Sequence, residues 1–442
     1  MDKETKFKFF FKFSSVVTNL FPRIGGRFLD TTLKTLLGNR IVLNSIEQKT
    51  RKVVKRTKKF ASLLFVADLN IGDAVISSSA IAALREIFPK AEIDFVVKKS
   101  TRNFVEGNPD ISNLFPIYEG APFPTNDDLL RLTRVARAKK YDLVINFSPM
   151  IDDKLFGGIK VLNYQMMAAQ LVRNEKSSQS VNNISFQTYN FIRNAFRDFL
   201  PLCNYARFEG ATIYLSDNAI REAKGFLLNH DIVIKERPLI MFTPDASAPF
   251  TRIPFGIQRD LLKRLCALQC TILLSGGHIE RNIEQRLMNS LPPEARRNIF
   301  IVPVSMAIEV YAALVDLVDI FFSGDTGPLH LAAARKFERG SGKSLRNKTA
   351  VFSIFGGTPP RIYGYDSKTP GFIPANQDAP SRTFVAASPC RNITCINKMA
   401  KTCKEVRCFD SLNLDDIVSE AASHIASVKI LRAQENYLVP AK

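Results

Sequence analysis

The chain lacks several features that would assign it to a simple class. Its 442 residues include no tryptophan and only four histidines. No stretch of 18 uncharged apolar residues occurs, so we expect no membrane-spanning helix. The seven cysteines are odd in number and thinly spread, which does not suggest a secreted disulfide scaffold, and we expect a reducing compartment. Lysines interrupt the apolar residues near the N-terminus, which argues against a cleaved signal peptide.

The positive charge is concentrated in an N-terminal arm. The chain has a formal net charge of +19, and residues 1–60 hold 15 Lys/Arg against 4 Asp/Glu. Lysines alternate there with phenylalanines ("KFKFFFKF"), a pattern typical of a segment lying on an anionic membrane surface; a solvated, disordered tail is the alternative. Outside the arm the charge is diffuse, so nucleic acid is not an expected partner.

The remainder of the chain has the composition of a globular protein, with 46% hydrophobic and 23% charged residues. Strand-like runs alternate with helical ones twice, first from about residue 61 and again from about residue 239. This alternation predicts an α/β protein with two doubly wound domains and a cleft between them. The predicted domains are residues 1–60 (arm), 61–234, 235–410, and 411–442 (a helix from about Leu412 to Val428 with a tail).

A polar motif separates a strand-like run from a helix-like run at "SGDTGPLH", Ser323 to His330. Free N–H groups at a helix start, beside a hydroxyl and an imidazole, are suited to binding a diphosphate. A plain helix cap with a core histidine is the alternative. Asp73 stands at the corresponding place in the first series, in "LNIGDAV". It is a candidate general base, with simple helix capping as the alternative.

Together the two motifs resemble those of the heptosyltransferases, glycosyltransferase family 9. The ordered set runs from about residue 61 to 428 and includes "IGDAVISSSAIAALREIFPKAEI", "LLSGGHIERN", "SGDTGPLHLAAA" and "FSIFGGTPP". The resemblance implies a GT-B fold, with two Rossmann-like domains facing a central cleft. It also implies transfer of a heptose from ADP-heptose to a lipopolysaccharide-core or related lipid-linked oligosaccharide, with inversion. Such an enzyme would work in the cytoplasm, peripherally on the inner face of the membrane.

The resemblance also assigns roles to residues. Asp73 matches the family's proposed catalytic base. Donor binding is expected of Thr243, Arg252, Gly277, Glu280, Asp325, Thr326, Gly327 and His330. No cofactor or metal is expected, and the chain has no Asp-X-Asp triplet, the diphosphate-metal motif of many metal-dependent sugar transferases.

The chain departs from the family pattern around "TPDASAPFTRIPF" (243–255), where family members often have Lys-X-Trp-Pro. Arg252 replaces the lysine and no tryptophan follows. Asp68 also stands where relatives often have a basic residue. These differences leave open another nucleotide sugar or acceptor, or a non-catalytic descendant that binds nucleotide sugar. A weaker possibility is a metal site made by four cysteines, Cys390, Cys395, Cys403 and Cys408.

Overall fold

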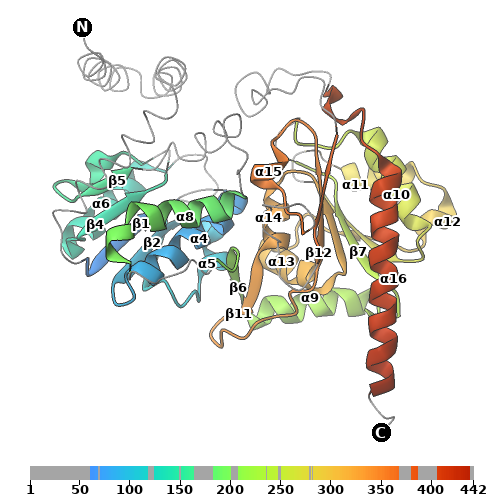
Figure 1. The fold of residues 1–442 in the computed structure, drawn as a ribbon, viewed down its shortest axis with the longest axis horizontal. Helices are drawn as coiled ribbons and strands as arrows, with labels where there is room; N and C mark the ends of the chain where they lie inside the picture. The colour runs from blue at the N-terminus through green and yellow to red at the C-terminus, as the bar shows by residue number, and fades with distance from the viewer. Residues whose placement is uncertain are drawn as a thin grey trace. The chain divides into compact units, whose positions relative to one another are not determined.

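The structure of the chain is a computed structural model (Figure 1). It describes residues 60–67, 70–117, 124–148, 151–163, 183–200, 208–234, 236–246, 250–277, 280, 282–367, 380–386 and 406–438. The chain divides into two units, Met1–Lys58 and Lys59–Lys442. The predicted membrane arm, Asp68, and the three cysteines Cys390, Cys395 and Cys403 lie outside the described residues.

The first half of the second unit is built on a five-stranded parallel sheet in the order β3-β2-β1-β4-β5. Its strands are β1 (Ser62–Val66), β2 (Glu92–Lys98), β3 (Asn113–Ile117), β4 (Leu143–Asn146) and β5 (Val161–Asn163). The helices of this half are α4 (Ile71–Ile87), α5 (Arg102–Val105), α6 (Asn126–Lys139) and α8 (Ile184–Ala195), with short 3₁₀ turns η1 (Lys99–Thr101), η2 (Asp153–Phe156) and η3 (Arg197–Phe199).

The second half contains a six-stranded parallel sheet in the order β13-β12-β10-β7-β8-β9. Its strands are β7 (Leu239–Thr243), β8 (Thr271–Ser275), β9 (Ile299–Val302), β10 (Ile320–Ser323), β12 (Ala350–Phe355) and β13 (Arg382–Val385). Its helices are α9 (Asp217–Asn229), α10 (Phe255–Cys266), α11 (Ile283–Asn289), α12 (Pro293–Arg296), α13 (Ile308–Leu317), α14 (Gly327–Ala333), α15 (Pro360–Tyr363) and α16 (Leu414–Leu438), with the 3₁₀ turn η6 (Arg407–Phe409).

Both sheets follow the doubly wound strand order. In each, the first strand in sequence lies in the middle, and the order reverses between it and the fourth strand. The reversal lies between β1 and β4 in the first sheet and between β7 and β10 in the second. The prediction of two doubly wound α/β units is therefore confirmed. Ligands bind to such sheets at the carboxyl ends of the strands that flank this reversal.

A two-stranded parallel sheet that the sequence did not predict joins β6 (Thr212–Leu215) to β11 (Arg335–Glu338). One hydrophobic cluster contains Val75 of α4 and Phe104 of α5 together with residues of β6, α13 and α14. The two halves therefore share buried core, and Lys59–Lys442 forms one compact unit.

The C-terminal helix α16 continues ten residues past the predicted end at Val428. An ion pair explains the difference, because Arg432 Nη2 donates to both carboxylate oxygens of Asp319, at 2.8 and 2.7 Å. Asp319 is fully buried at the start of β10 and also accepts from Arg346 at 2.7 Å. The last turns of the helix are thus tied to the second sheet.

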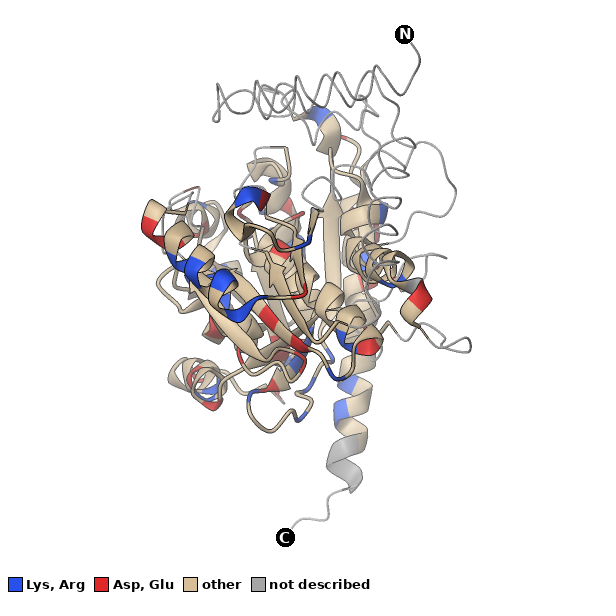
Figure 2. Cartoon of the chain, turned by 90° about the vertical axis from the view of Figure 1, so that its left-hand side faces the viewer, with Lys and Arg blue, Asp and Glu red and all other residues tan. Residues whose placement is uncertain are grey.

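The described helices include none that is long and apolar enough to cross a membrane. Basic and acidic residues intermix over the described part of the chain (Figure 2).

Candidate functional site

Asp73 lies in the first turn of α4, directly after the central strand β1. Its side chain is exposed to solvent, while the surrounding protein raises the pKa of its carboxyl group and the charge of Lys98 opposes that rise. Water therefore reaches a carboxyl group that is otherwise surrounded by protein. A solvated carboxylate with a raised pKa has the properties of a general base.

The motif from Ser323 to His330 follows β10, on the other side of the reversal point in the second sheet. The pKa of Asp325 is raised to about 6, mainly by burial. A hydrogen bond from Thr358 opposes this rise, and the negative charge of Asp73 adds to it. Thr326 stands at the N-cap position of α14 but makes no side-chain cap. Its hydroxyl lies 3.0 Å from that of Ser323 instead.

The two motifs are in direct contact through a pair of glycines. A Cβ atom on Gly72 would lie 2.8 Å from His330 Cδ2 and 3.3 Å from Gly327 Cα. A Cβ atom on Gly327 would lie 3.4 Å from the backbone nitrogen of Gly72. The missing side chains let the starts of α4 and α14 approach at van der Waals distance. The structure therefore brings together Asp73, Asp325, Thr326, Gly327 and His330.

His330 is buried and its pKa is lowered to about 4 by burial, so the ring is neutral near pH 7. Its Nδ1 atom lies 2.9 Å from the hydroxyl oxygen of Tyr365, which is also buried. The sequence reading missed Tyr365. Its position ten residues after the end of β12, in "PPRIYGYD", was the available signal.

A second cluster gathers at the carboxyl ends of β7 and β8. Arg252 Nε lies 3.2 Å from Asp245 Oδ1, Nη1 lies 3.3 Å from Glu280 Oε2, and Nη2 donates to the Ala246 carbonyl at 3.0 Å. A Cβ atom on Gly277 would lie 3.0 Å from Asp245 Oδ2. The structure thus joins three of the predicted residues, Arg252, Gly277 and Glu280, around Asp245.

Asp245 was missed from the sequence, although an acid two residues after a central strand is a recognisable signal. It is buried and accepts from the backbone nitrogen of Glu280 at 3.2 Å. Because Asp245 and Glu280 both face Arg252, the guanidinium is fixed between two carboxylates and does not stand as an isolated cation.

The two clusters adjoin along the backbone. A Cβ atom on Gly324 would lie 2.7 Å from the carbonyl oxygen of Thr251, the residue before Arg252. Thr243 is buried at the end of β7 and pairs with Ser323, the first residue of the motif, in the register of β7 and β10. Its hydroxyl lies 2.7 Å from that of Tyr311 on α13.

Lys98 is a further residue that the sequence reading missed. It ends β2, the neighbour of β1, and its Nζ donates to Asn70 Oδ1 at 3.0 Å. The signal was a lysine at the carboxyl end of a strand beside the one that leads to Asp73.

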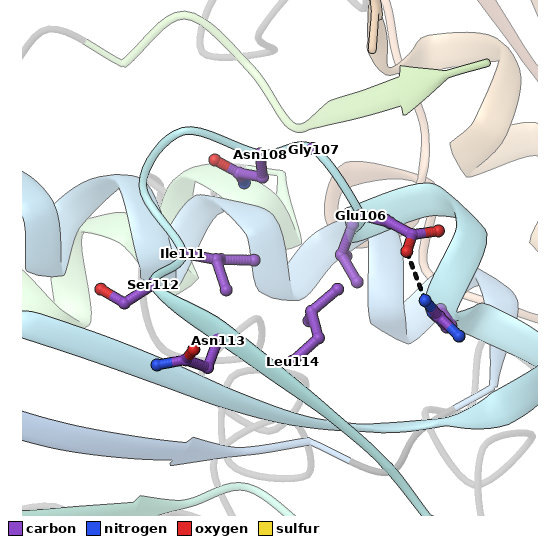
Figure 3. Close-up of a pocket in the computed structure, with 9 residues that line it drawn as sticks. Glu106, Gly107, Asn108, Ile111, Ser112, Asn113 and Leu114 are labelled. Atoms are coloured by element: carbon purple, nitrogen blue, oxygen red, sulfur yellow. Dashed lines mark hydrogen bonds and ion pairs between the residues drawn. The ribbon is translucent and has the colours of Figure 1, made fainter. Parts of the chain in front are cut away.

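A separate hollow of about 400 Å³ lies between α5 and the start of β3, lined by residues from Arg102 to Leu114 (Figure 3). None of the predicted site residues lines it. Of the four cysteines considered for a metal site, the structure describes only Cys408, which is buried. The described residues contain no cluster of three or more His, Cys, Asp or Glu placed to hold a metal ion.

Comparison with known proteins points to one family. The pattern of glycosyltransferase family 9 (heptosyltransferase) matches residues 169–338. The chain is 23% identical to lipopolysaccharide heptosyltransferase 3 of Escherichia coli K12 over 313 residues, which is 65% of this chain and 80% of that protein.

Two solved structures share the fold. The family 9 glycosyl transferase of Veillonella parvula has a TM-score of 0.62 at 14% identity, and covers 84% of this chain and 99% of its own. The Escherichia coli ADP-heptose lipopolysaccharide heptosyltransferase II has a TM-score of 0.56 at 16% identity, covering 83% and 99%. The expected GT-B fold with two Rossmann-like units is confirmed by this likeness.

Proposed function

Because this chain is a glycosyltransferase with a family 9 (heptosyltransferase) domain, we propose that it transfers a heptose from ADP-heptose to a lipopolysaccharide-core or related glycan, with inversion. The observation that carries the proposal is the contact between the starts of α4 and α14. It places Asp73 next to the Asp325–His330 motif.

In the proposed reaction, an acceptor hydroxyl attacks the anomeric carbon while the bond from that carbon to the diphosphate breaks. Asp73 takes the proton of the hydroxyl, and ADP leaves with the electron pair of the broken bond. Positioned acid–base groups of this kind contribute about 10²- to 10⁴-fold to rate. The raised pKa and solvent exposure of Asp73 support its assignment as the base.

The donor diphosphate would lie at the loop from Gly324 to Gly327, where backbone N–H groups meet it. Arg252 would supply a positive charge beside this loop, since Thr251 already contacts Gly324. Asp245 and Glu280 hold the guanidinium in place. Glu280 could then accept from a ribose hydroxyl, as acids do in other Rossmann sites. The reaction in this form uses no metal ion.

The acceptor is proposed to be lipid-linked, and the protein to work in the cytoplasm on the inner face of the membrane. The basic, phenylalanine-rich residues 1–60 support this part of the proposal, because such a segment is attracted to anionic headgroups. The relative named lipopolysaccharide heptosyltransferase 3 supports the choice of acceptor class.

The first experiment is calorimetric binding of ADP-heptose, ADP, UDP-sugars and GDP-sugars to the wild type, Asp325→Ala and Arg252→Ala. We expect selective binding of the ADP compounds. Loss of charge-assisted bonds worth about 1.5–3 kcal/mol predicts about 10- to 100-fold weaker binding by Arg252→Ala. Arg259→Ala is the matched control, because Arg259 forms an exposed pair with Asp260 on α10.

The second experiment tests catalysis separately from binding. Asp73→Asn should bind ADP-heptose like the wild type and lose about 10²-fold or more in kcat. Full turnover by Asp73→Asn would contradict the base assignment. Selective binding of a different nucleotide sugar would overturn the donor, and no binding of any compound would favour a non-catalytic role.

A further inference from the structure

The carboxyl end of β2 places a lysine beside the proposed base. β2 pairs with β1 in parallel register, with Val66 opposite Val96. Lys98 is therefore two residues past the last paired residue of β1, on the edge of the sheet where α4 and Asp73 begin. It is partly exposed, so a bound molecule at that edge can reach it.

Asn70 holds Lys98 in this position. Asn70 stands at the N-cap of α4, a place where asparagine usually accepts a hydrogen bond from the first turn of the helix. Here it makes no side-chain cap, and its Oδ1 accepts from Lys98 Nζ at 3.0 Å. The side chain that would cap α4 is used to fix an ammonium group at the start of the same helix.

Charges from two elements act on Asp73: Lys98 on β2 is positive and Asp325 after β10 is negative. His330 on α14, which packs against the neighbouring Gly72, is neutral near pH 7. The side of the base that faces β2 is therefore electropositive, and the side that faces the donor loop is electronegative. An anionic acceptor is favoured on the β2 side.

We propose that Lys98 binds an anionic group of the acceptor, a phosphate or a carboxylate, and thereby orients the attacking hydroxyl towards Asp73. The proposal rests on the proposed function and adds a residue and an acceptor chemistry to it. A lysine suits this role because its ammonium is a compact charge with three donors on a flexible chain. The same charge opposes the rise in the pKa of Asp73 that the surrounding protein causes, so one side chain both places the acceptor and favours the ionised form of the base.

The test compares Lys98→Met with the wild type in steady-state kinetics with an anionic lipid-linked oligosaccharide acceptor. We expect the acceptor KM to rise about 10- to 100-fold, the size of a lost charge-assisted bond. The acid limb of the kcat/KM profile should move to higher pH, because the positive charge that lowers the pKa of Asp73 is gone. Lys98→Arg should recover part of the acceptor KM, and Asn70→Ala should show a smaller loss.

Lys99→Met is the control, since Lys99 is the exposed neighbour of Lys98 in the sequence and lies on η1. Acceptors that are dephosphorylated, or esterified at their carboxylates, identify the anionic group. Removing the group that Lys98 binds should abolish the difference in acceptor KM between Lys98→Met and the wild type. An unchanged acceptor KM in Lys98→Met would overturn the proposal, even if the pH profile moved. Calorimetric binding of ADP-heptose is measured for Lys98→Met and for the wild type. Failure of the proposed function would appear as a wild type that does not bind the donor, whereas failure of the Lys98 proposal leaves donor binding intact.

Discussion

Replacing Asp325 by asparagine should make the protein more stable and less active. Burial raises the pKa of this carboxyl from its ordinary value of 3.8 to about 6. Between these values the folded state binds more protons than the unfolded state, so the free energy of unfolding falls as the pH rises. Above about pH 6 the folded protein carries the full penalty of an ionised, partly buried carboxylate. Asparagine has nearly the same shape and no charge, which removes the penalty.

The size of the effect follows from the pKa difference. One pKa unit corresponds to about 1.4 kcal/mol, so the difference sets an upper limit of about 3 kcal/mol. Asp325 is partly exposed, and solvent screening reduces the expected effect to about 1–2 kcal/mol. Urea unfolding at a series of pH values between 4 and 8 measures it. We expect Asp325→Asn and the wild type to converge near pH 4 and to separate by about 1–2 kcal/mol at pH 8.

The same variant should be less active, because asparagine cannot change its charge as the diphosphate arrives and leaves. Asp260→Asn, on the exposed face of α10, is the control and should change neither quantity. A variant Asp325→Asn that is no more stable than the wild type at pH 8, or a difference that does not depend on pH, would refute the electrostatic reasoning.

Three glycine substitutions test the packing around the site. Gly72→Ala should lower kcat/KM and destabilise the fold by about 1–3 kcal/mol, because its Cβ would lie 2.8 Å from His330 Cδ2; activity and melting assays measure both effects. Gly225→Ala, within α9 and with open space around its Cβ, should instead stabilise by about 0.5–1 kcal/mol, and a loss of stability there would contradict the packing argument. Gly107→Ala should be among the most damaging, since Gly107 has a φ of +86° and its Cβ would lie 2.3 Å from Arg339 Cγ; a melting temperature equal to the wild type would contradict this contact.

The contact made by Arg339 shows what sequence patterns could not predict. Its guanidinium donates to the carbonyl of Asn103 at 2.6 Å, to the carbonyl of Glu106 at 3.0 Å and to the carboxylate of Glu309 at 2.7 Å. The partners come from α5, the turn after it, and α13, more than 200 residues apart along the chain. Hydrophobic periodicity reports which face of an element is buried, but it carries no information about which distant elements meet. The β6–β11 sheet was missed for the same reason.

The elements themselves were predictable because parallel strands in this fold are continuous apolar runs with helices between them. The last helix, predicted from about Leu412, begins at Leu414. The contact of Asp73 with the Asp325 motif follows from their shared position at a strand end beside a reversal of strand order. The partners of Arg252 did not follow, since a lone arginine in a sequence does not reveal that Asp245 and Glu280 neutralise it.

That neutralisation changes how the leaving group in the proposed reaction can be stabilised. A departing diphosphate brings negative charge to the loop that carries Asp325, and the positive charge of Arg252 is already shared between Asp245 and Glu280, of which Glu280 also pairs with Arg286. Backbone N–H groups of the loop and a reduced charge on Asp325 itself would then add to the stabilisation that Arg252 supplies. A carboxyl whose pKa is about 6 before any ligand binds can take up a proton near neutral pH when a diphosphate arrives. The partly buried position of Asp325, unfavourable for stability, therefore suits a site that must accept an anion and release it again after each transfer.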